Sequence, residues 1–130
     1  MCGIAGYFGK KKIDLNRLSL TLSLMRNRGP DAQNYQSYTN RNENLYLLHS
    51  RLSIIDLSPR SNQPYNSNDL SLIFNGEIYN YREVRQKLVQ LGHSFETFSD
   101  TEVLLKSYLE YGKDCVNHLN GMWAFAIWDK

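Results

Sequence analysis

Met1-Cys2-Gly3-Ile4-Ala5-Gly6 opens the chain and places a cysteine directly behind the initiator methionine. Methionine is normally removed when the second residue is small, and this would leave Cys2 as the N-terminal residue. An N-terminal cysteine combines a thiol nucleophile with a base, because its free α-amino group has a reference pKa of about 7.7–8.0. A simpler interpretation is a core strand through Ile4 and Ala5 with Cys2 as a buried thiol. This stretch alone leaves both interpretations open.

The composition is that of one balanced domain. The 130 residues, 42% of them hydrophobic, suffice for a single sizeable core. The 15 basic and 13 acidic residues give a net charge of +2, which favours no nucleic-acid partner and no acidic tail. The run Lys10-Lys11-Lys12 is typical of a solvated turn.

The cysteines and the hydropathy pattern predict a cytoplasmic protein. Cys2 and Cys115 lie far apart and lack metal-ligand spacing, so we expect free thiols in a reducing compartment and no metal site. The N-terminus lacks the basic and apolar segments of a secretory signal. The chain also lacks an apolar stretch of about 18 residues, so no membrane partner is expected.

Short apolar runs alternate with helical patterns along the chain. The runs predict strands at residues 3–8, 35–38, 45–50, 70–75, 95–98 and 122–128. Apolar residues at helical spacing predict helices at residues 15–27, 81–91 and 100–111, capped by Asp14, Asn80 and Ser99. Gly76 is expected to end its strand. This pattern indicates an α+β layered domain, and we expect further residues to follow the last strand.

Two arginine-containing motifs lie where predicted elements give way to loops, which is where sites are usually assembled. The first, Arg28-Gly29-Pro30-Asp31, is most simply a turn that ends a helix and contains an Arg–Asp contact. The second surrounds Arg51. This residue is either a surface arginine or a planar guanidinium that holds both oxygens of a carboxylate.

Asn75-Gly76-Glu77 is compatible with a tight turn and with a catalytic role. An Asn amide beside a Gly N–H group forms an oxyanion hole, in which two donors converge on one developing negative charge. Glu77 would then be able to hold a cationic group. Asp100 is favoured by the dipole of its helix in any case, but it could hold the same cation. Together with Cys2 and Arg51, these residues describe an amino-acid substrate with a side-chain amide.

Six motifs resemble the N-terminal glutaminase domain of glutamine-hydrolysing asparagine synthetases, which are class II glutamine amidotransferases of the N-terminal-nucleophile hydrolase superfamily. In order along the chain, they are Met1–Gly6, Arg28–Asp31, Arg51–Asp56, Asn75–Asn80, Ser99–Glu102 and Gly121–Ala126. The run Arg51-Leu52-Ser53-Ile54-Ile55-Asp56 is similar to the asparagine synthetase branch rather than to the sugar-phosphate or purine branches. The resemblance covers essentially the whole chain. It implies a four-layer αββα sandwich that is incomplete at its C-terminus.

The resemblance also assigns roles to individual residues. It implies that Cys2 is the nucleophile and that Asn75 and Gly76 form the oxyanion hole. The glutamine carboxylate would be held by Arg51, and its ammonium group by Glu77 and Asp100. The backbone of Leu52, Ser53, Ile54 and Ile55 would line the pocket. His49, His93 and His118 match no functional position of the family, and Cys115 is expected to be a packing residue.

The function implied by the resemblance is hydrolysis of L-glutamine to L-glutamate and ammonia through a cysteine thioester. Residues 1–130 would be a truncated glutaminase domain without a cofactor of its own, the nitrogen-donating half of an asparagine synthase or close relative. Its partner would be a synthetase domain in cis or in trans, which carries the ATP and Mg site and a Ser-Gly-Gly-x-Asp-Ser loop absent here.

Two other readings of the function stay open at this point. The chain could be a non-catalytic module that keeps the fold and serves in glutamine sensing or in interaction with a partner. It could also be a hydrolase of other amides, but such an enzyme would not need Arg51 together with Glu77 and Asp100. The oligomeric state is open as well, and the chain could form a homodimer.

Overall fold

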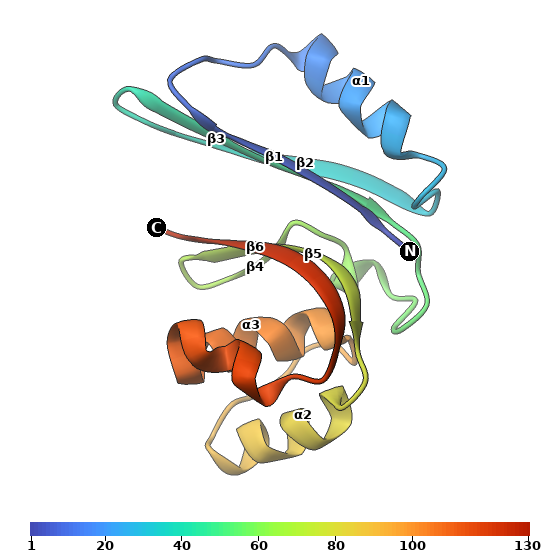
Figure 1. Ribbon diagram of the computed structural model, residues 1–130, viewed down its shortest axis with the longest axis vertical. Helices are drawn as coiled ribbons and strands as arrows, with labels where there is room; N and C mark the ends of the chain where they lie inside the picture. The colour runs from blue at the N-terminus through green and yellow to red at the C-terminus, as the bar shows by residue number, and fades with distance from the viewer.

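The computed structural model describes residues 1–130 and arranges them in four layers (Figure 1). Two antiparallel sheets, each of three strands, lie face to face. Helix α1 (Leu15–Met25) covers the outer face of the first sheet, and α2 (Tyr81–Gln90) and α3 (Asp100–Tyr111) cover the outer face of the second. The αββα sandwich expected from the sequence is therefore present.

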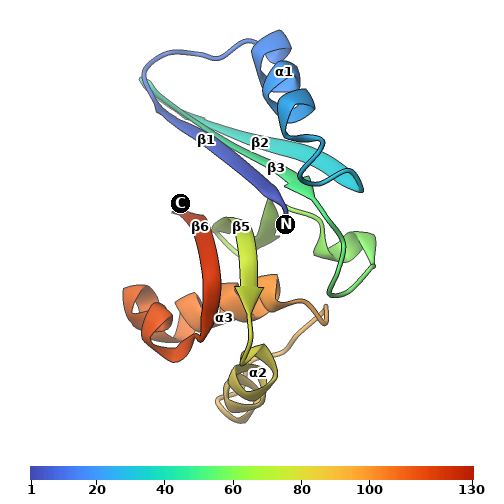
Figure 2. The same ribbon diagram turned by 45° about the vertical axis from the view of Figure 1, so that its right-hand side comes forward.

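The first sheet has the strand order β1-β3-β2, with β1 at Gly3–Gly9, β3 at Glu43–Arg51 and β2 at Ala32–Asn40. In its register, Gly3 of β1 lies opposite Ser50 of β3. Cys2, one residue before Gly3, is therefore placed beside the end of β3 and the residues that follow it. In both ribbon views this end of β1 lies beside the second sheet (Figures 1 and 2).

The second sheet has the order β4-β5-β6, with β4 at Tyr65–Ser67, β5 at Leu70–Ile78 and β6 at Gly121–Asp129. The prediction that Gly76 ends its strand was wrong, because β5 continues through Gly76 to Ile78 and pairs with β6 throughout. A β-carbon on Gly76 would lie 2.2 Å from the Met122 carbonyl oxygen. The missing side chain lets the two strands approach closely, so the glycine extends the sheet instead of breaking it.

Local capping explains where two of the helices begin. The Asp14 carboxylate accepts a hydrogen bond from the Arg17 N–H group at 2.9 Å, and the Ser99 hydroxyl accepts one from the Glu102 N–H group at 3.4 Å. The predicted cap at Asn80 is wrong in its contacts, since its side chain makes no capping bond. Its amide instead bonds the backbone of residues 118 and 120, which joins the start of α2 to the turn before β6.

The predicted strand at residues 95–98 is absent, and the segment is a loop. The buried Glu102 carboxylate accepts hydrogen bonds from the N–H groups of Glu96 and Thr97, at 3.0 and 2.7 Å. On the other side, the Arg85 guanidinium donates to the Thr97 carbonyl oxygen at 2.6 Å. Side chains from α2 and α3 therefore satisfy backbone groups that a neighbouring strand would otherwise have bonded.

The largest core cluster lies between the second sheet and its two helices, and includes Leu72, Leu88 and Leu104. Cys115 belongs to this cluster, so the expectation of a packing residue is confirmed; burial raises the pKa of its thiol.

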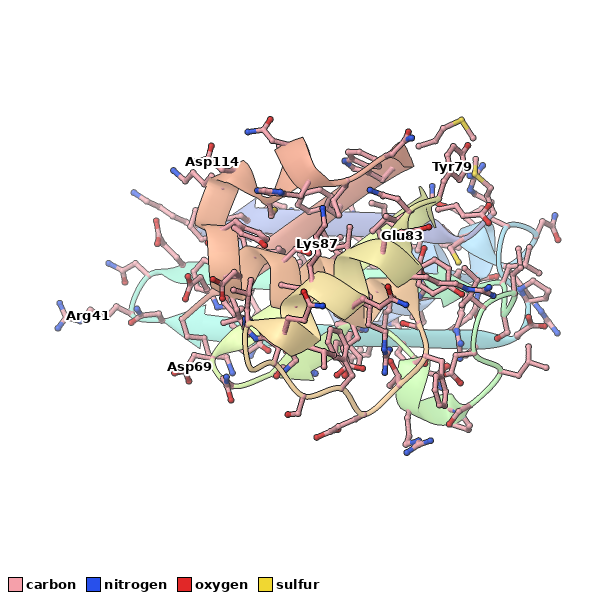
Figure 3. The ribbon with its side chains drawn as sticks, turned by 90° about the horizontal axis from the view of Figure 1, so that it is seen from below. Arg41, Asp69, Tyr79, Glu83, Lys87 and Asp114 are labelled. Carbon is pink, nitrogen blue, oxygen red and sulfur yellow. The ribbon has the colours of Figure 1, made fainter.

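Seen from below, α2 turns charged residues such as Glu83 and Lys87 outward (Figure 3). None of the helices is long and apolar enough to cross a membrane.

Candidate active site

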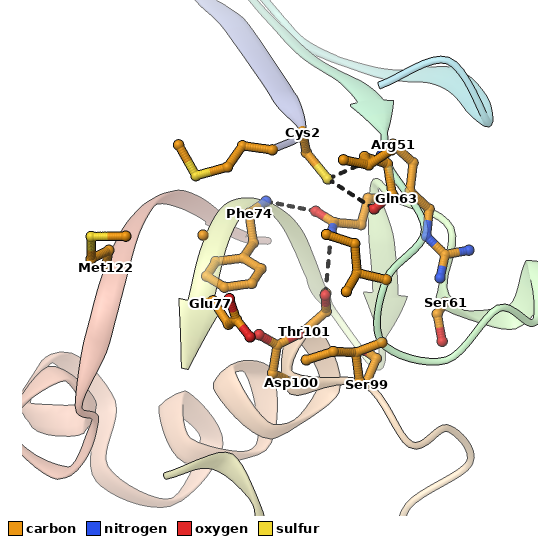
Figure 4. Close-up of a pocket in the computed structure, with 15 residues that line it drawn as sticks. Cys2, Arg51, Ser61, Gln63, Phe74, Glu77, Ser99, Asp100, Thr101 and Met122 are labelled. Carbon is orange, nitrogen blue, oxygen red and sulfur yellow. Dashed lines mark hydrogen bonds between the residues drawn. The ribbon is translucent and has the colours of Figure 1, made fainter. Parts of the chain in front are cut away.

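A pocket lies where the N-terminal end of β1 meets the end of β3, the middle of β5 and the start of α3 (Figure 4). It brings together most of the residues singled out from the sequence, namely Cys2, Arg51, Leu52, Ile54, Ile55, Gly76, Glu77 and Asp100. Ser53 and Asn75 are the two candidates that are not among its lining residues. Met1 and Met122 also line the pocket and are largely exposed.

The Cys2 side chain is held by the backbone that follows β3. The Leu52 N–H group points at the Cys2 sulfur from 3.3 Å, and the thiol reaches the Leu52 carbonyl oxygen at 3.6 Å. A backbone N–H group in this position stabilises negative charge on the sulfur. The thiol is therefore half-buried, beside a donor and open to the pocket.

The motif Arg28-Gly29-Pro30-Asp31 supports Cys2 and does not form the Arg–Asp contact that we expected. The only ion pair in the structure joins His93 and Glu110. Arg28 donates from Nε to the Cys2 carbonyl oxygen at 2.9 Å. The Asp31 carboxylate instead accepts a hydrogen bond from the Ser53 N–H group at 2.7 Å, and Ser53 does not line the pocket.

Arg51 is buried, with 5% of its surface exposed, so the surface-arginine interpretation is wrong. Its guanidinium donates to the carbonyl oxygen of Ser58 at 3.0 Å and to the Asn62 side-chain oxygen at 2.8 Å. A third bond reaches the Asp56 carbonyl oxygen. Since a guanidinium has five N–H donors, these bonds fix its plane and leave two donors free for a ligand.

The register of β5 directs a backbone donor into the pocket. Odd-numbered residues of β5 are bonded to β6, as the bond from Tyr79 to Asn120 at the end of the ladder indicates. Even-numbered residues therefore direct their N–H groups toward the other edge, where the Ile78 N–H group donates to Asp100 at 3.2 Å. By the same alternation, the Gly76 N–H group points toward the pocket that Gly76 lines.

The Asn75 side chain lies on the face of β5 that is turned toward the first sheet. It shares this face with Ile73, which packs against Leu45 and Leu47 of β3. The Asn75 side-chain oxygen is buried and has no hydrogen-bond partner. Unpaired buried polar atoms are uncommon in proteins, and they are found where a ligand or water completes the bonding.

Two carboxylates face each other at the base of the pocket. Asp100 is 6% exposed, and burial is the main reason why its pKa lies above the ordinary value. The negative charge of Glu77 raises the pKa of Asp100 further, whereas hydrogen bonds from backbone N–H groups, including that of Ile78, partly oppose this. A cation bound between the carboxylates would relieve both the burial and the repulsion. The arrangement therefore suits an ammonium group.

Asp56 is a residue that the sequence analysis did not assign to the site. It adopts the left-handed conformation with φ of +53°, and its carboxylate accepts N–H groups from Ser58 at 2.9 Å and from Phe98 at 2.7 Å. Burial opposes ionisation, but these bonds, the Ser61 hydroxyl and the charge of Arg51 together hold the pKa of Asp56 below its ordinary value. Asp56 therefore ties the loop that holds Arg51 to the segment that leads into Asp100.

Gln63 is a second residue that the sequence analysis missed. It lines the pocket and is 4% exposed. Its only sequence signal is a polar residue in a loop rich in Ser, Asn and Pro, which does not separate it from its neighbours.

The pocket has no group of three or more His, Cys, Asp or Glu side chains that could hold a metal ion, and neither has any other part of the structure.

Comparisons with known proteins point to one family. The protein-family model described as the glutamine amidotransferase domain matches residues 1–130 of the sequence. The chain is 41% identical to asparagine synthetase [glutamine-hydrolyzing] 3 of Bacillus subtilis, over all of this chain and 22% of that protein. It is 38% identical to asparagine synthetase B [glutamine-hydrolyzing] of Escherichia coli, over 99% of this chain and 23% of that protein. The chain thus spans less than a quarter of the length of these two relatives.

A solved structure with a similar fold is glutamine phosphoribosylpyrophosphate amidotransferase from B. subtilis, complexed with ADP and GMP. It has a TM-score of 0.71 and 20% sequence identity, and the match covers 96% of this chain and 35% of that one. At this identity the likeness concerns the fold. Together with the matches along the sequence, it leads to one conclusion: the chain belongs to the glutamine amidotransferase domain family and is related over its whole length to glutamine-hydrolysing asparagine synthetases.

Proposed function

We propose that the chain hydrolyses L-glutamine to L-glutamate and ammonia, with Cys2 as the nucleophile. The observation that carries this proposal is the meeting of four groups in one pocket: the Cys2 sulfur, the Arg51 guanidinium, the Gly76 N–H group and the Glu77–Asp100 carboxylates. Each of these groups matches one part of glutamine. A simple amide hydrolase would need the nucleophile and the oxyanion donor, but not Arg51 together with Glu77 and Asp100.

Charge complementarity orients the substrate. The two free donors of Arg51 bind the α-carboxylate, and the fixed plane of the guanidinium lowers the entropic cost of this contact. Glu77 and Asp100 bind the α-ammonium group. With both ends of the amino acid held, the side-chain amide is directed toward Cys2, which converts a bimolecular attack into an oriented one.

The chemical step is acyl transfer. After Met1 is removed, the free α-amino group of Cys2 accepts the thiol proton as the sulfur attacks the amide carbon. The resulting oxyanion is stabilised by two donors, the Gly76 N–H group and the side-chain amide nitrogen of Asn75. The ammonium form of the α-amine returns its proton to the leaving nitrogen, and ammonia departs. Water then hydrolyses the thioester and releases glutamate.

Two contacts and the position of Met1 support this assignment of Cys2. The Leu52 N–H group faces the sulfur, and Arg28 holds the Cys2 carbonyl oxygen, so the nucleophile is fixed by its side chain and by its backbone. Met1 lies in the pocket and would acylate the nitrogen that serves as the base. Its removal would therefore open the pocket and generate the base in one step.

We further propose that the ammonia serves a synthetase domain, in cis or in trans, that forms asparagine or a related amide. The names of the relatives and the fraction of their length that is matched support this proposal. ATP and Mg would be needed only by that domain.

The assignment is tested by measuring glutamate release from glutamine in Cys2→Ala. The matched control is Cys115→Ala, which removes the only other thiol of the chain; this thiol lies in the main core cluster and does not line the pocket. Loss of glutamate release in Cys2→Ala, with activity retained in Cys115→Ala, is the expected result. Glutamine binding by the unaltered protein without any glutamate release would instead favour a sensing module.

A further inference from the structure

On the edge of β5 that faces the pocket, side chains take over the backbone hydrogen bonding at the point where the neighbouring strand β4 ends. β4 pairs with β5 only as far as Leu72. Two residues further along, the Phe74 N–H group donates to the Gln63 side-chain oxygen at 2.6 Å. The Phe74 carbonyl oxygen is bonded by His49 Nε2 at 3.2 Å. Both polar groups of Phe74 on this edge are thus bonded by buried side chains from other elements.

The direction of the His49 bond follows from its partner. A carbonyl oxygen only accepts hydrogen bonds, so Nε2 carries the proton and donates it. His49 is 1% exposed, and its other nitrogen, Nδ1, is buried without a partner. Burial is the main reason why the pKa of His49 falls to about 4, and the charge of Arg51 lowers it further. The ring is therefore a neutral donor with a fixed tautomer.

Gln63 connects this edge to the other half of the pocket. Its side-chain nitrogen donates to the Thr101 hydroxyl at 3.2 Å, and Thr101 follows Asp100 in the first turn of α3 (Figure 4). One buried amide therefore bridges β5, which carries Gly76, and α3, which carries Asp100. The bridge spans the distance between the oxyanion donor and a proposed ammonium-binding carboxylate.

We propose that His49 and Gln63 are positioning residues, which hold the Phe74 peptide group so that Asn75 and Gly76 present their donors at the correct place. The inference rests on the proposed glutaminase function and assigns neither residue a contact with the reacting atoms. Apolar side chains of the same size would fill the same space at a lower cost in desolvation free energy, because buried polar groups are unfavourable unless they form hydrogen bonds. Their hydrogen bonds therefore have a role beyond packing.

Four variants separate positioning from packing. His49→Leu removes the donor, whereas His49→Gln places an amide nitrogen at nearly the same distance along the side chain. Gln63→Met keeps the length and removes both bonds, and Thr101→Val breaks only the bond toward α3. Val84→Ala, a change on α2 within the core cluster, is the control for a general loss of stability, since Val84 does not line the pocket.

The expected pattern is a fall in kcat of about tenfold or more for glutamine hydrolysis in His49→Leu and Gln63→Met, with most of it restored in His49→Gln. Thr101→Val is expected to raise KM more than it lowers kcat, since it acts on the Asp100 side. An independent readout is amide hydrogen exchange, in which the Phe74 N–H group exchanges faster in Gln63→Met than in Val84→Ala.

Two results overturn the inference, and they differ. If the unaltered protein releases glutamate and both His49→Leu and Gln63→Met keep its kcat, the positioning role is wrong and the glutaminase function stands. If the unaltered protein releases no glutamate, the proposed function fails, and the positioning role fails with it. Should Gln63→Met not fold, the comparison of His49→Leu with His49→Gln decides the question alone.

Discussion

The substitution Gly76→Ala offers a quantitative test of the proposed oxyanion site. A β-carbon at this position would lie 2.2 Å from the Met122 carbonyl oxygen and 2.6 Å from the Trp123 Cα atom, whereas real contacts of this kind do not fall below 3.0 Å. Both are backbone atoms of β6 and cannot rotate away as a flexible side chain could, so β5 and β6 must separate by about 0.8 Å.

This displacement is large compared with the tolerance of a hydrogen bond. Oxyanion donors act from about 2.7–3.1 Å, so a displacement of about 0.8 Å takes the Gly76 N–H group out of the narrow range in which it can hold the oxyanion. Loss of one such donor typically lowers kcat by about 10²–10³-fold, equivalent to about 2.7–4 kcal/mol. We therefore expect kcat for glutamine hydrolysis to fall by this factor while KM changes much less.

The assay compares steady-state glutamate release by Gly76→Ala and Gly92→Ala. Gly92 has a φ of +98° and open space around its β-position, so alanine there strains the backbone without a steric clash and far from the pocket. The rate at which iodoacetamide alkylates Cys2 shows whether the nucleophile itself is intact. A folded Gly76→Ala variant with kcat within about threefold of the unaltered protein would refute the reasoning.

Two further predictions concern pH. Burial and the charge of Glu77 raise the pKa of Asp100, and a bound ammonium group should lower this pKa again. Glutamine affinity, measured by calorimetry, should therefore improve as pH rises through the raised pKa. The variant Asp100→Asn should bind glutamine weakly at every pH. The pKa of His49 is lowered from 6.5 to about 4, so the unfolded state binds more protons between these values, and about 3 kcal/mol of folding stability should be lost as pH falls from 6.5 to 4. Denaturant unfolding across this range measures the loss, and a His49→Gln variant with the same pH slope would contradict the assignment.

The parts of the fold that the sequence predicts are those with local causes. Asp14 and Ser99 cap their helices through bonds to residues three positions away, and both caps are present. Asn80 has the same local pattern, but its partners lie 38 and 40 residues further along the chain. The apolar spacing at residues 95–98 was misleading for the same reason, since distant side chains determine that loop.

The same distinction applies to the candidate site. Motifs of adjacent residues pointed to Cys2, Arg51 and Gly76, and the structure places all three around one pocket. Asp56 and Gln63 were missed as contributors because their important partners are 42 and 38 residues away in sequence. Supporting residues of this kind become visible only when the two sheets and α3 are packed together.

The most direct test of the central claim is to trap the thioester on Cys2. The protein is mixed with glutamine, quenched in acid within one turnover, and its N-terminal peptide is analysed by mass spectrometry. The account predicts a peptide that begins at Cys2, without Met1, and carries a γ-glutamyl group. Glutamate release by a protein that retains Met1, or whose Cys2 never carries the acyl group, would contradict it.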